Sequence, residues 1–260
     1  MIQYSKNKNN IIILKLVSQA IFDKNNDFFE SFCNCIDKIE KEGDINGIVL
    51  NLQNNKSVNS YDVKKNFEEK DPIACFKKVE IEKSILRRFE TLDIPKVAIL
   101  DGSVFNLIFE LALCCNYRIT LNDNNQKFGF THINLGLMPG KGGAVRLTRE
   151  IGIEQTLDFL LFEKSSNVKS LVEKGVLQNS ADSLNELTSL AENFINKNQK
   201  YNQPWDEKNY KIPGGASYQN DNPIIIADYL TRIFKKNLRN FPVYEAIIST
   251  VTEGASLSFD

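Results

Sequence analysis

Two side chains of this sequence combine a chemically useful type with surroundings that favour catalysis. Glu110 is the only charged residue in residues 107–115, a segment that is apolar almost all round and therefore predicts a helix buried on every side. A buried carboxylate without a partner costs several kcal/mol or acquires a raised pKa. His132 is the only histidine of the chain, and an imidazole with a pKa of about 6.5 can accept or donate protons near neutrality. The pair predicts acid/base chemistry.

These two residues need strands and helices to position them, and the apolar pattern predicts such elements. Largely apolar runs predict buried strands at residues 11–16, 47–52 and 96–100, and a further strand is predicted at residues 117–121. Apolar residues at helical spacing predict helices at residues 27–41, 81–92, 107–115, 144–151, 156–162 and 185–200. Residues 172–178 are predicted to end in a short strand. We therefore expect a single layered α/β domain over residues 1–260, with a helical C-terminal part from about residue 185.

Two loops stand out between these elements. Residues 140–143, Gly-Lys-Gly-Gly, predict a tight turn before the next helix, because they lack the Gly-Lys-Ser/Thr ending of a phosphate-binding loop. Residues 51–59 form a polar loop after a predicted strand, and loops at strand ends are where such folds bind ligands. No Gly-x-Gly-x-x-Gly follows a strand, so dehydrogenase activity is not expected from this chain.

Composition excludes several classes of function. A net charge of −1 and a pI near 6.0 argue against nucleic acid or an anionic membrane as partner, since both favour a basic face. The five cysteines form no Cys-x-x-Cys pair, and with one histidine they do not supply a usual zinc site, so no metal is expected. The apolar run at residues 11–16 is too short for a signal-peptide core or a membrane span. We expect a soluble cytoplasmic protein with reduced thiols.

The stretch that contains both candidate residues carries a family resemblance. It contains Asp101-Gly102, Glu110-Leu111-Ala112-Leu113, Cys115-Asn116-Tyr117-Arg118-Ile119, Phe128-Gly129, Leu135-Gly136, Pro139-Gly140, Gly142-Gly143 and Arg146-Leu147. In order and spacing these motifs resemble those of the crotonase superfamily, the enoyl-CoA hydratases and isomerases. The tail adds Gln203-Pro204-Trp205-Asp206, Lys211-Ile212-Pro213-Gly214-Gly215 and Glu253-Gly254-Ala255-Ser256-Leu257. It resembles the hydratase half of the bifunctional fatty-acid β-oxidation protein.

The resemblance implies a fold, an assembly and a substrate. It implies a crotonase-type α/β spiral of strand-strand-helix turns with a C-terminal helical region, assembled as a homotrimer or hexamer. The substrate implied is an acyl-CoA, with coenzyme A as part of the substrate and no separate cofactor. In the related protein the chain continues into a hydroxyacyl-CoA dehydrogenase. No such domain is expected within residues 1–260, so a separate dehydrogenase or thiolase is an expected partner.

The resemblance also implies roles for particular residues. Glu110 matches the first family glutamate, and His132 stands where the family has the second. The backbone N–H groups of Tyr61 and Leu107 correspond to the two donors of an oxyanion hole, which stabilises an enolate. The family's Ala-Gly-Ala-Asp loop reads Asn59-Ser60-Tyr61-Asp62 here, and its Gly-Gly-Gly turn reads Asn106-Leu107-Ile108. Asn59, Ser60 and Asp62 are therefore the predicted substrate-binding residues.

Three functions follow from this interpretation. The first is hydration or isomerisation of an enoyl-CoA by Glu110 and His132 in fatty-acid β-oxidation. The second is a crotonase-fold thioester hydrolase or decarboxylase, and the third is a catalytically degenerate acyl-CoA-binding or assembly subunit. The catalytic function requires Glu110 and His132 to face one pocket, where each is expected to favour the charged form of the other.

Overall fold

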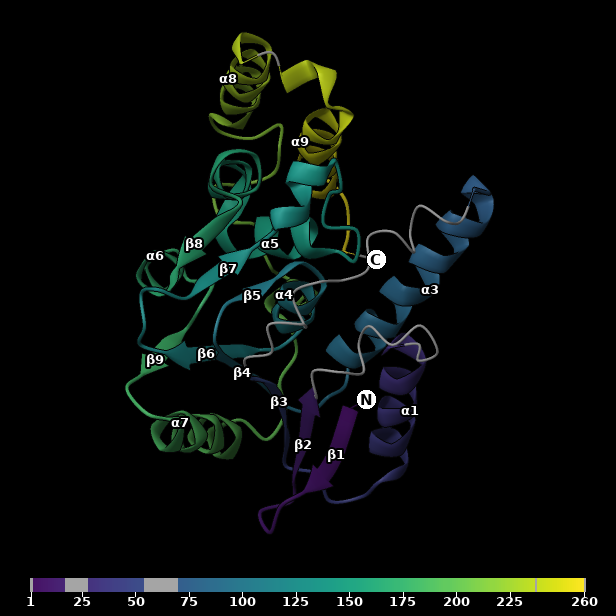
Figure 1. Cartoon of the computed structure of the whole chain (residues 1–260), viewed down its shortest axis with the longest axis vertical. Coiled ribbons are helices and arrows are strands. Elements are labelled where there is room, and N and C mark those ends of the chain that lie inside the picture. The colour runs from purple at the N-terminus through teal and green to yellow at the C-terminus, as the bar shows by residue number, and fades with distance from the viewer. Residues whose placement is uncertain (1, 17–27, 54–69, 237, 260) are drawn as a thin grey trace.

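The computed structural model describes residues 2–16, 28–53, 70–236 and 238–259. Its larger sheet has six strands in the order β1-β2-β3-β4-β6-β9 (Figure 1). The strands are β1 (Ile2–Lys6), β2 (Ile11–Leu16), β3 (Gly47–Gln53), β4 (Lys96–Asp101), β6 (Tyr117–Leu121) and β9 (Asn179–Ala181). β1 pairs antiparallel with β2, and each later pair is parallel. The four strands predicted from the sequence are thus confirmed, and the structure shows that they are neighbours in one sheet.

A second, smaller sheet places the elements of the candidate site. It has the order β5-β7-β8, with β5 at Val104–Phe105, β7 at Lys127–Gly129 and β8 at Ser165–Asn167. β5 and β7 run parallel, with Phe105 opposite Gly129. A Cβ atom at Gly129 would lie 2.2 Å from the carbonyl oxygen of Lys164, so only glycine fits this close approach. Because both strands lead directly into short helices, their pairing brings the starts of those helices side by side.

Helices cover both faces of the larger sheet (Figure 1). They are α1 (Phe28–Lys41), α3 (Pro72–Glu90), α4 (Asn106–Leu113), α5 (Gly143–Leu157), α6 (Val168–Glu173), α7 (Leu184–Lys197), α8 (Asn222–Lys235) and α9 (Pro242–Gly254). Shorter helical segments are η1 (Thr131–Leu135), η2 (Asp158–Glu163), η3 (Pro204–Asp206) and η4 (Leu238–Asn240). Apart from η3 and η4, the described elements after β9 are α-helices, as expected for the C-terminal part. No helix in the described ranges has the length and apolar character needed to cross a membrane.

Two apolar clusters form on opposite faces of the larger sheet. Side chains such as Ile12 and Leu50 belong to the main core with α1, α4 and α5, whereas Ile11 and Val49 pack with residues of α7. Adjacent residues in a strand point to opposite faces, so a strand buried on both faces is apolar at most of its positions. This is why the predicted strand positions are confirmed.

Three parts of the secondary structure differ from the sequence prediction. Helix α3 begins at Pro72 rather than at residue 81, because the Asp71 side chain accepts a hydrogen bond from the Ile73 N–H and caps an earlier first turn. Residues 172–178 do not end in a strand. Helix α6 occupies Val168–Glu173, capped by Asn167, and β9 follows at Asn179–Ala181 beside β6. The sequence prediction also omitted β1, the three strands of the smaller sheet, α8 and α9.

Candidate active site

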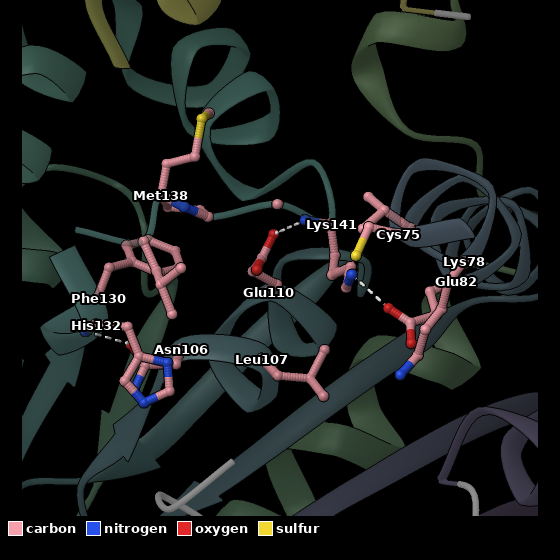
Figure 2. Close-up of a pocket in the computed structure, with 14 residues that line it drawn as sticks. Cys75, Lys78, Glu82, Asn106, Leu107, Glu110, Phe130, His132, Met138 and Lys141 are labelled. Atoms are coloured by element: carbon pink, nitrogen blue, oxygen red, sulfur yellow. Dashed lines mark hydrogen bonds and ion pairs between the residues drawn. The ribbon is translucent and has the colours of Figure 1, made fainter. Parts of the chain in front are cut away.

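A cavity of about 260 Å³ lies where α3, α4, η1 and the turn before α5 meet (Figure 2). α4 contributes Asn106, Leu107 and Glu110 to its lining. The remaining lining residues are Cys75, Lys78, Val79 and Glu82 of α3, Phe130 and His132, and Leu137, Met138, Pro139, Gly140 and Lys141 of the turn. The cavity therefore brings Glu110 and His132 to one site, as the sequence predicts.

Glu110 is buried and is held by the turn that precedes α5. Its Oε2 atom accepts hydrogen bonds from the backbone N–H groups of Lys141 at 2.7 Å and Gly143 at 2.8 Å. Burial raises the pKa of Glu110 to about 6, although these N–H groups and the charges of Lys141 and Arg146 act to lower it. A carboxyl with this pKa changes protonation state close to neutral pH.

Buried ion pairs hold the turn in place. The Lys141 ammonium pairs with the Glu82 carboxylate of α3. The Arg146 guanidinium donates to the Lys141 carbonyl at 2.9 Å and to both oxygens of Glu90 at 2.7 and 2.8 Å. Breaking a buried ion pair by removal of one partner typically costs about 3–5 kcal/mol. α3 and α5 thus fix the N–H groups that orient Glu110.

His132 is half-buried on η1, across the cavity from the turn (Figure 2). Burial alone lowers the pKa of its imidazole. The expectation that Glu110 and His132 favour the charged forms of each other is therefore wrong. Burial is the largest cause of both shifts and disfavours a charge on either group, and neither residue is among the causes of the shift of the other.

Of the two predicted oxyanion donors, the structure describes Leu107 but not Tyr61, and it does not describe the predicted binding residues. Leu107 is the second residue of α4, so its backbone N–H has no i−4 carbonyl partner within the helix, and the residue lines the cavity. Tyr61 and the predicted binding residues Asn59, Ser60 and Asp62 lie outside the described residues. Their roles stay predictions.

Sequence analysis missed the contributions of α3 and of the glycine-rich turn. The sequence pattern does not indicate Glu82 or Lys78 as site residues, and it predicts residues 140–143 only as a turn before a helix. The sequence did contain a feature that points to this role. A glycine-rich turn before a helix exposes backbone N–H groups that bind anions, and residues 140–143 form such a turn. Among the described residues, no group of three or more His, Cys, Asp or Glu side chains is placed to hold a metal ion. All five cysteines are free thiols.

Comparison with known families and proteins gives a consistent result. Residues 7–203 match the enoyl-CoA hydratase/isomerase family model. A fatty acid oxidation complex subunit alpha from Shewanella loihica is 30% identical over 167 residues, which cover 64% of this chain and 23% of the relative. The subunit of the same name from Aliivibrio fischeri is 28% identical over 234 residues, which cover 87% of this chain and 33% of that relative. This chain thus spans about a quarter to a third of the length of these relatives.

Solved structures show the same architecture. An enoyl-CoA hydratase from Bacillus anthracis matches with a TM-score of 0.64 and 17% identity, covering 97% of this chain and 90% of that one. An enoyl-CoA hydratase/isomerase from Cupriavidus metallidurans matches with a TM-score of 0.63 and 16% identity, covering 75% of this chain and 74% of that one. At these identities the likeness establishes the fold alone.

Proposed function

Because the chain belongs to the enoyl-CoA hydratase/isomerase family and has the crotonase fold, we propose that its cavity binds an acyl-CoA thioester and hydrates an enoyl double bond. The observation that carries this proposal is a pair of proton-transfer groups in one cavity. Glu110 has a pKa of about 6, and His132 faces the same space from another element.

The two groups suit different halves of the reaction. Where environments shift two titratable groups in opposite directions, the group with the raised pKa is suited to be the acid and the group with the lowered pKa the base. Glu110 is then the acid and His132 the base. At pH 7 about a tenth of Glu110 carries its proton, and bound thioester increases this fraction by excluding water.

The proposed steps transfer one water molecule to the substrate. The water oxygen bonds to C3, the π electrons move towards the thioester carbonyl, and His132 takes a proton from the water. The resulting enolate takes the proton of Glu110 at C2. The imidazolium then returns a proton to the Glu110 carboxylate, so that the protein regains its starting state.

The enolate oxygen needs hydrogen-bond donors, and we assign that role to backbone N–H groups. The Leu107 N–H at the start of α4 is one donor, and the Tyr61 N–H is the other. Asn59, Ser60 and Asp62 are assigned to substrate binding in the same loop. His132 stands at the position of the second family glutamate. The base is then an imidazole in place of a carboxylate, and it still accepts a proton.

This chemistry needs no cofactor beyond the coenzyme A carried by the substrate. The relatives in Shewanella loihica and Aliivibrio fischeri are named as subunits of fatty acid oxidation complexes. We therefore place the reaction in fatty-acid β-oxidation, with a separate dehydrogenase or thiolase consuming the product. Hydration is expected to be unaffected by a metal chelator.

The test is crotonyl-CoA hydration, followed by the loss of enoyl-thioester ultraviolet absorbance as a function of pH. Activity is expected to peak between the pKa values of the two groups. It declines as pH rises because Glu110, with a pKa of about 6, loses its proton, and it declines as pH falls through the lowered pKa of His132 because the imidazole gains one. Removing an acid/base group costs about 10²–10⁴-fold in rate, so Glu110→Gln should lower kcat by that factor. A rate that rises to a plateau above pH 7 would reverse the acid and base assignments.

Absence of hydration in native protein and variants would refute the proposed reaction. Release of free thiol or of carbon dioxide from acyl-CoA substrates would then identify a thioester hydrolase or decarboxylase. Acyl-CoA binding by calorimetry without turnover would identify a degenerate binding or assembly subunit, with the side chains of residues 106–108 restricting access to the cavity.

A further inference from the structure

Asn106 occupies an uncommon backbone position at the edge of the cavity. It is the first residue of α4, with φ at +55°, and the residue is buried, with 6% of its surface exposed. Among residues other than glycine, asparagine is one of the few that adopt the left-handed region readily. The backbone here suits glycine or asparagine, so the amide side chain is an addition that the backbone conformation does not itself require.

The Asn106 side chain joins α4 to η1. Its Oδ1 atom accepts a hydrogen bond from the His132 backbone N–H at 3.0 Å, and its Nδ2 atom donates to Thr131 Oγ1 at 3.1 Å. The first N–H groups of a helix lack partners within it, and Phe130, which precedes η1, supplies no side-chain cap. Asn106 therefore caps η1 from a distant part of the sequence.

This cap bears on where the imidazole lies. Among the described residues, no hydrogen bond or ion pair holds the His132 ring, so the ring is placed through its backbone. On one side Asn106 accepts from the His132 N–H, and on the other the His132 carbonyl accepts from the Leu137 N–H at 3.2 Å. Asn106 also begins the helix that carries Glu110. One amide thus connects the supports of both groups.

We propose that Asn106 is a positioning residue that fixes the His132 imidazole relative to the Glu110 carboxyl, an inference that rests on the proposed hydration. It acts through the backbone of η1 and takes no part in proton transfer. A displacement of about 1 Å in a catalytic group can cost about 100-fold in rate.

The principal variant is Asn106→Gly, which keeps the left-handed backbone free of strain and removes only the cap. Its kcat for crotonyl-CoA is expected to fall by about 10–100-fold with KM changed by less than about threefold. Asn220→Gly is the matched control, because Asn220 also has a positive φ of 51° and donates a side-chain hydrogen bond, to the Gly214 carbonyl at 2.9 Å. It lies away from the cavity and should leave kcat unchanged.

A second readout does not depend on activity. Since the chain has one histidine, its imidazole gives a single set of proton NMR signals whose pH titration reports the His132 pKa. In Asn106→Gly the released ring becomes more hydrated, so its pKa should rise towards about 6.5. An unchanged titration in this variant would overturn the proposal, whatever happens to kcat. If native protein shows no hydration, the proposed function fails while this titration still decides the role of Asn106.

Asn106→Asp provides a further variant should Asn106→Gly fail to fold. The carboxylate keeps the acceptor for the His132 N–H and places a negative charge beside η1, which favours the imidazolium and should raise the His132 pKa. A pKa equal to that of native protein would show that the side chain of residue 106 does not lie against this segment and would contradict the proposal.

Discussion

At the scale of single residues, the site depends on a balance between burial and hydrogen bonding at Glu110. Burial favours the neutral acid, and two backbone N–H groups favour the carboxylate. Burial is the larger effect, so the pKa is raised and the ionised group costs folding free energy. A group that lowers stability while serving a reaction is typical of active sites.

Replacing Glu110 by glutamine should make the protein more stable, in a pH-dependent way. The pKa rises from 4.5 in the unfolded chain to about 6 in the fold, so the stabilisation from protonation is complete below about pH 4.5 and lost as pH rises through about 6. At 1.36 kcal/mol per pKa unit, the advantage of Glu110→Gln over native protein should grow by about 2 kcal/mol between about pH 4 and pH 7.5. Urea unfolding at the two pH values measures it.

Glu173→Gln is the control for that measurement. Glu173 is exposed on α6, so its replacement should leave the pH dependence of stability as in native protein. An advantage of Glu110→Gln that stays constant with pH would mean that the carboxyl is not destabilised by burial.

Substitution of His132 tests whether the imidazole transfers protons. His132→Gln removes the base while keeping a polar side chain, and kcat for crotonyl-CoA should fall by about 10²–10⁴-fold. His132→Glu should recover part of that loss, because a carboxylate can also accept a proton. Steady-state kinetics of the three proteins decide the point. If native protein shows almost no hydration and His132→Glu raises it sharply, the chain is a degenerate or repurposed hydratase.

At the scale of elements, the turn of residues 140–143 and the start of α5 form a closely packed support for Glu110. A Cβ atom at Gly143 would lie 2.8 Å from Glu110 Cγ, 3.0 Å from its Oε2 and 3.1 Å from Phe130 Cζ. The first two contacts are with the side chain of Glu110, whose carboxyl accepts a hydrogen bond from the Gly143 N–H. Glycine at this position therefore lets the turn approach the carboxyl closely enough to bond it.

Gly143→Ala should disturb both stability and activity. Overpacking in a well-packed core costs about 1–3 kcal/mol, and the displaced carboxyl should lower kcat. Gly43→Ala is the matched control, since no atom lies within 4 Å of a Cβ at Gly43 and its φ is not positive. Chemical denaturation and crotonyl-CoA hydration of the two variants test this. Equal stability and activity would show that the turn moves away without cost.

At the scale of the whole molecule, helices α8 and α9 pack beside α5, away from the larger sheet, whereas α7 packs on that sheet (Figure 1). Large apolar side chains remain exposed on the single chain, among them Ile73, Phe76 and Ile81 of α3 and Ile224 of α8. Exposed apolar side chains such as the three on α3 are found at subunit contacts when they form a contiguous patch. This arrangement is compatible with the assembly that the family resemblance implies.

Light scattering on purified protein should therefore give a mass of three or six times the 29.6 kDa of one chain. The mass should persist on dilution through the range used for kinetic assays, as expected for closed symmetric assemblies with large apolar contacts. A monomer mass under these conditions would contradict the predicted homotrimer or hexamer.

The sequence by itself determined the α/β class, four of the six strands of the larger sheet and the candidate pair Glu110 and His132. These features leave local traces, since buried strands and a buried helix are apolar at most of their positions, and family motifs have a fixed spacing. Only the tertiary structure decided which other residues surround the pair. Glu82 meets Lys141, and Asn106 meets His132, through contacts between elements far apart in the sequence. The directions of the two pKa shifts depend on burial, which is set when separate elements pack together, and local sequence pattern does not specify it.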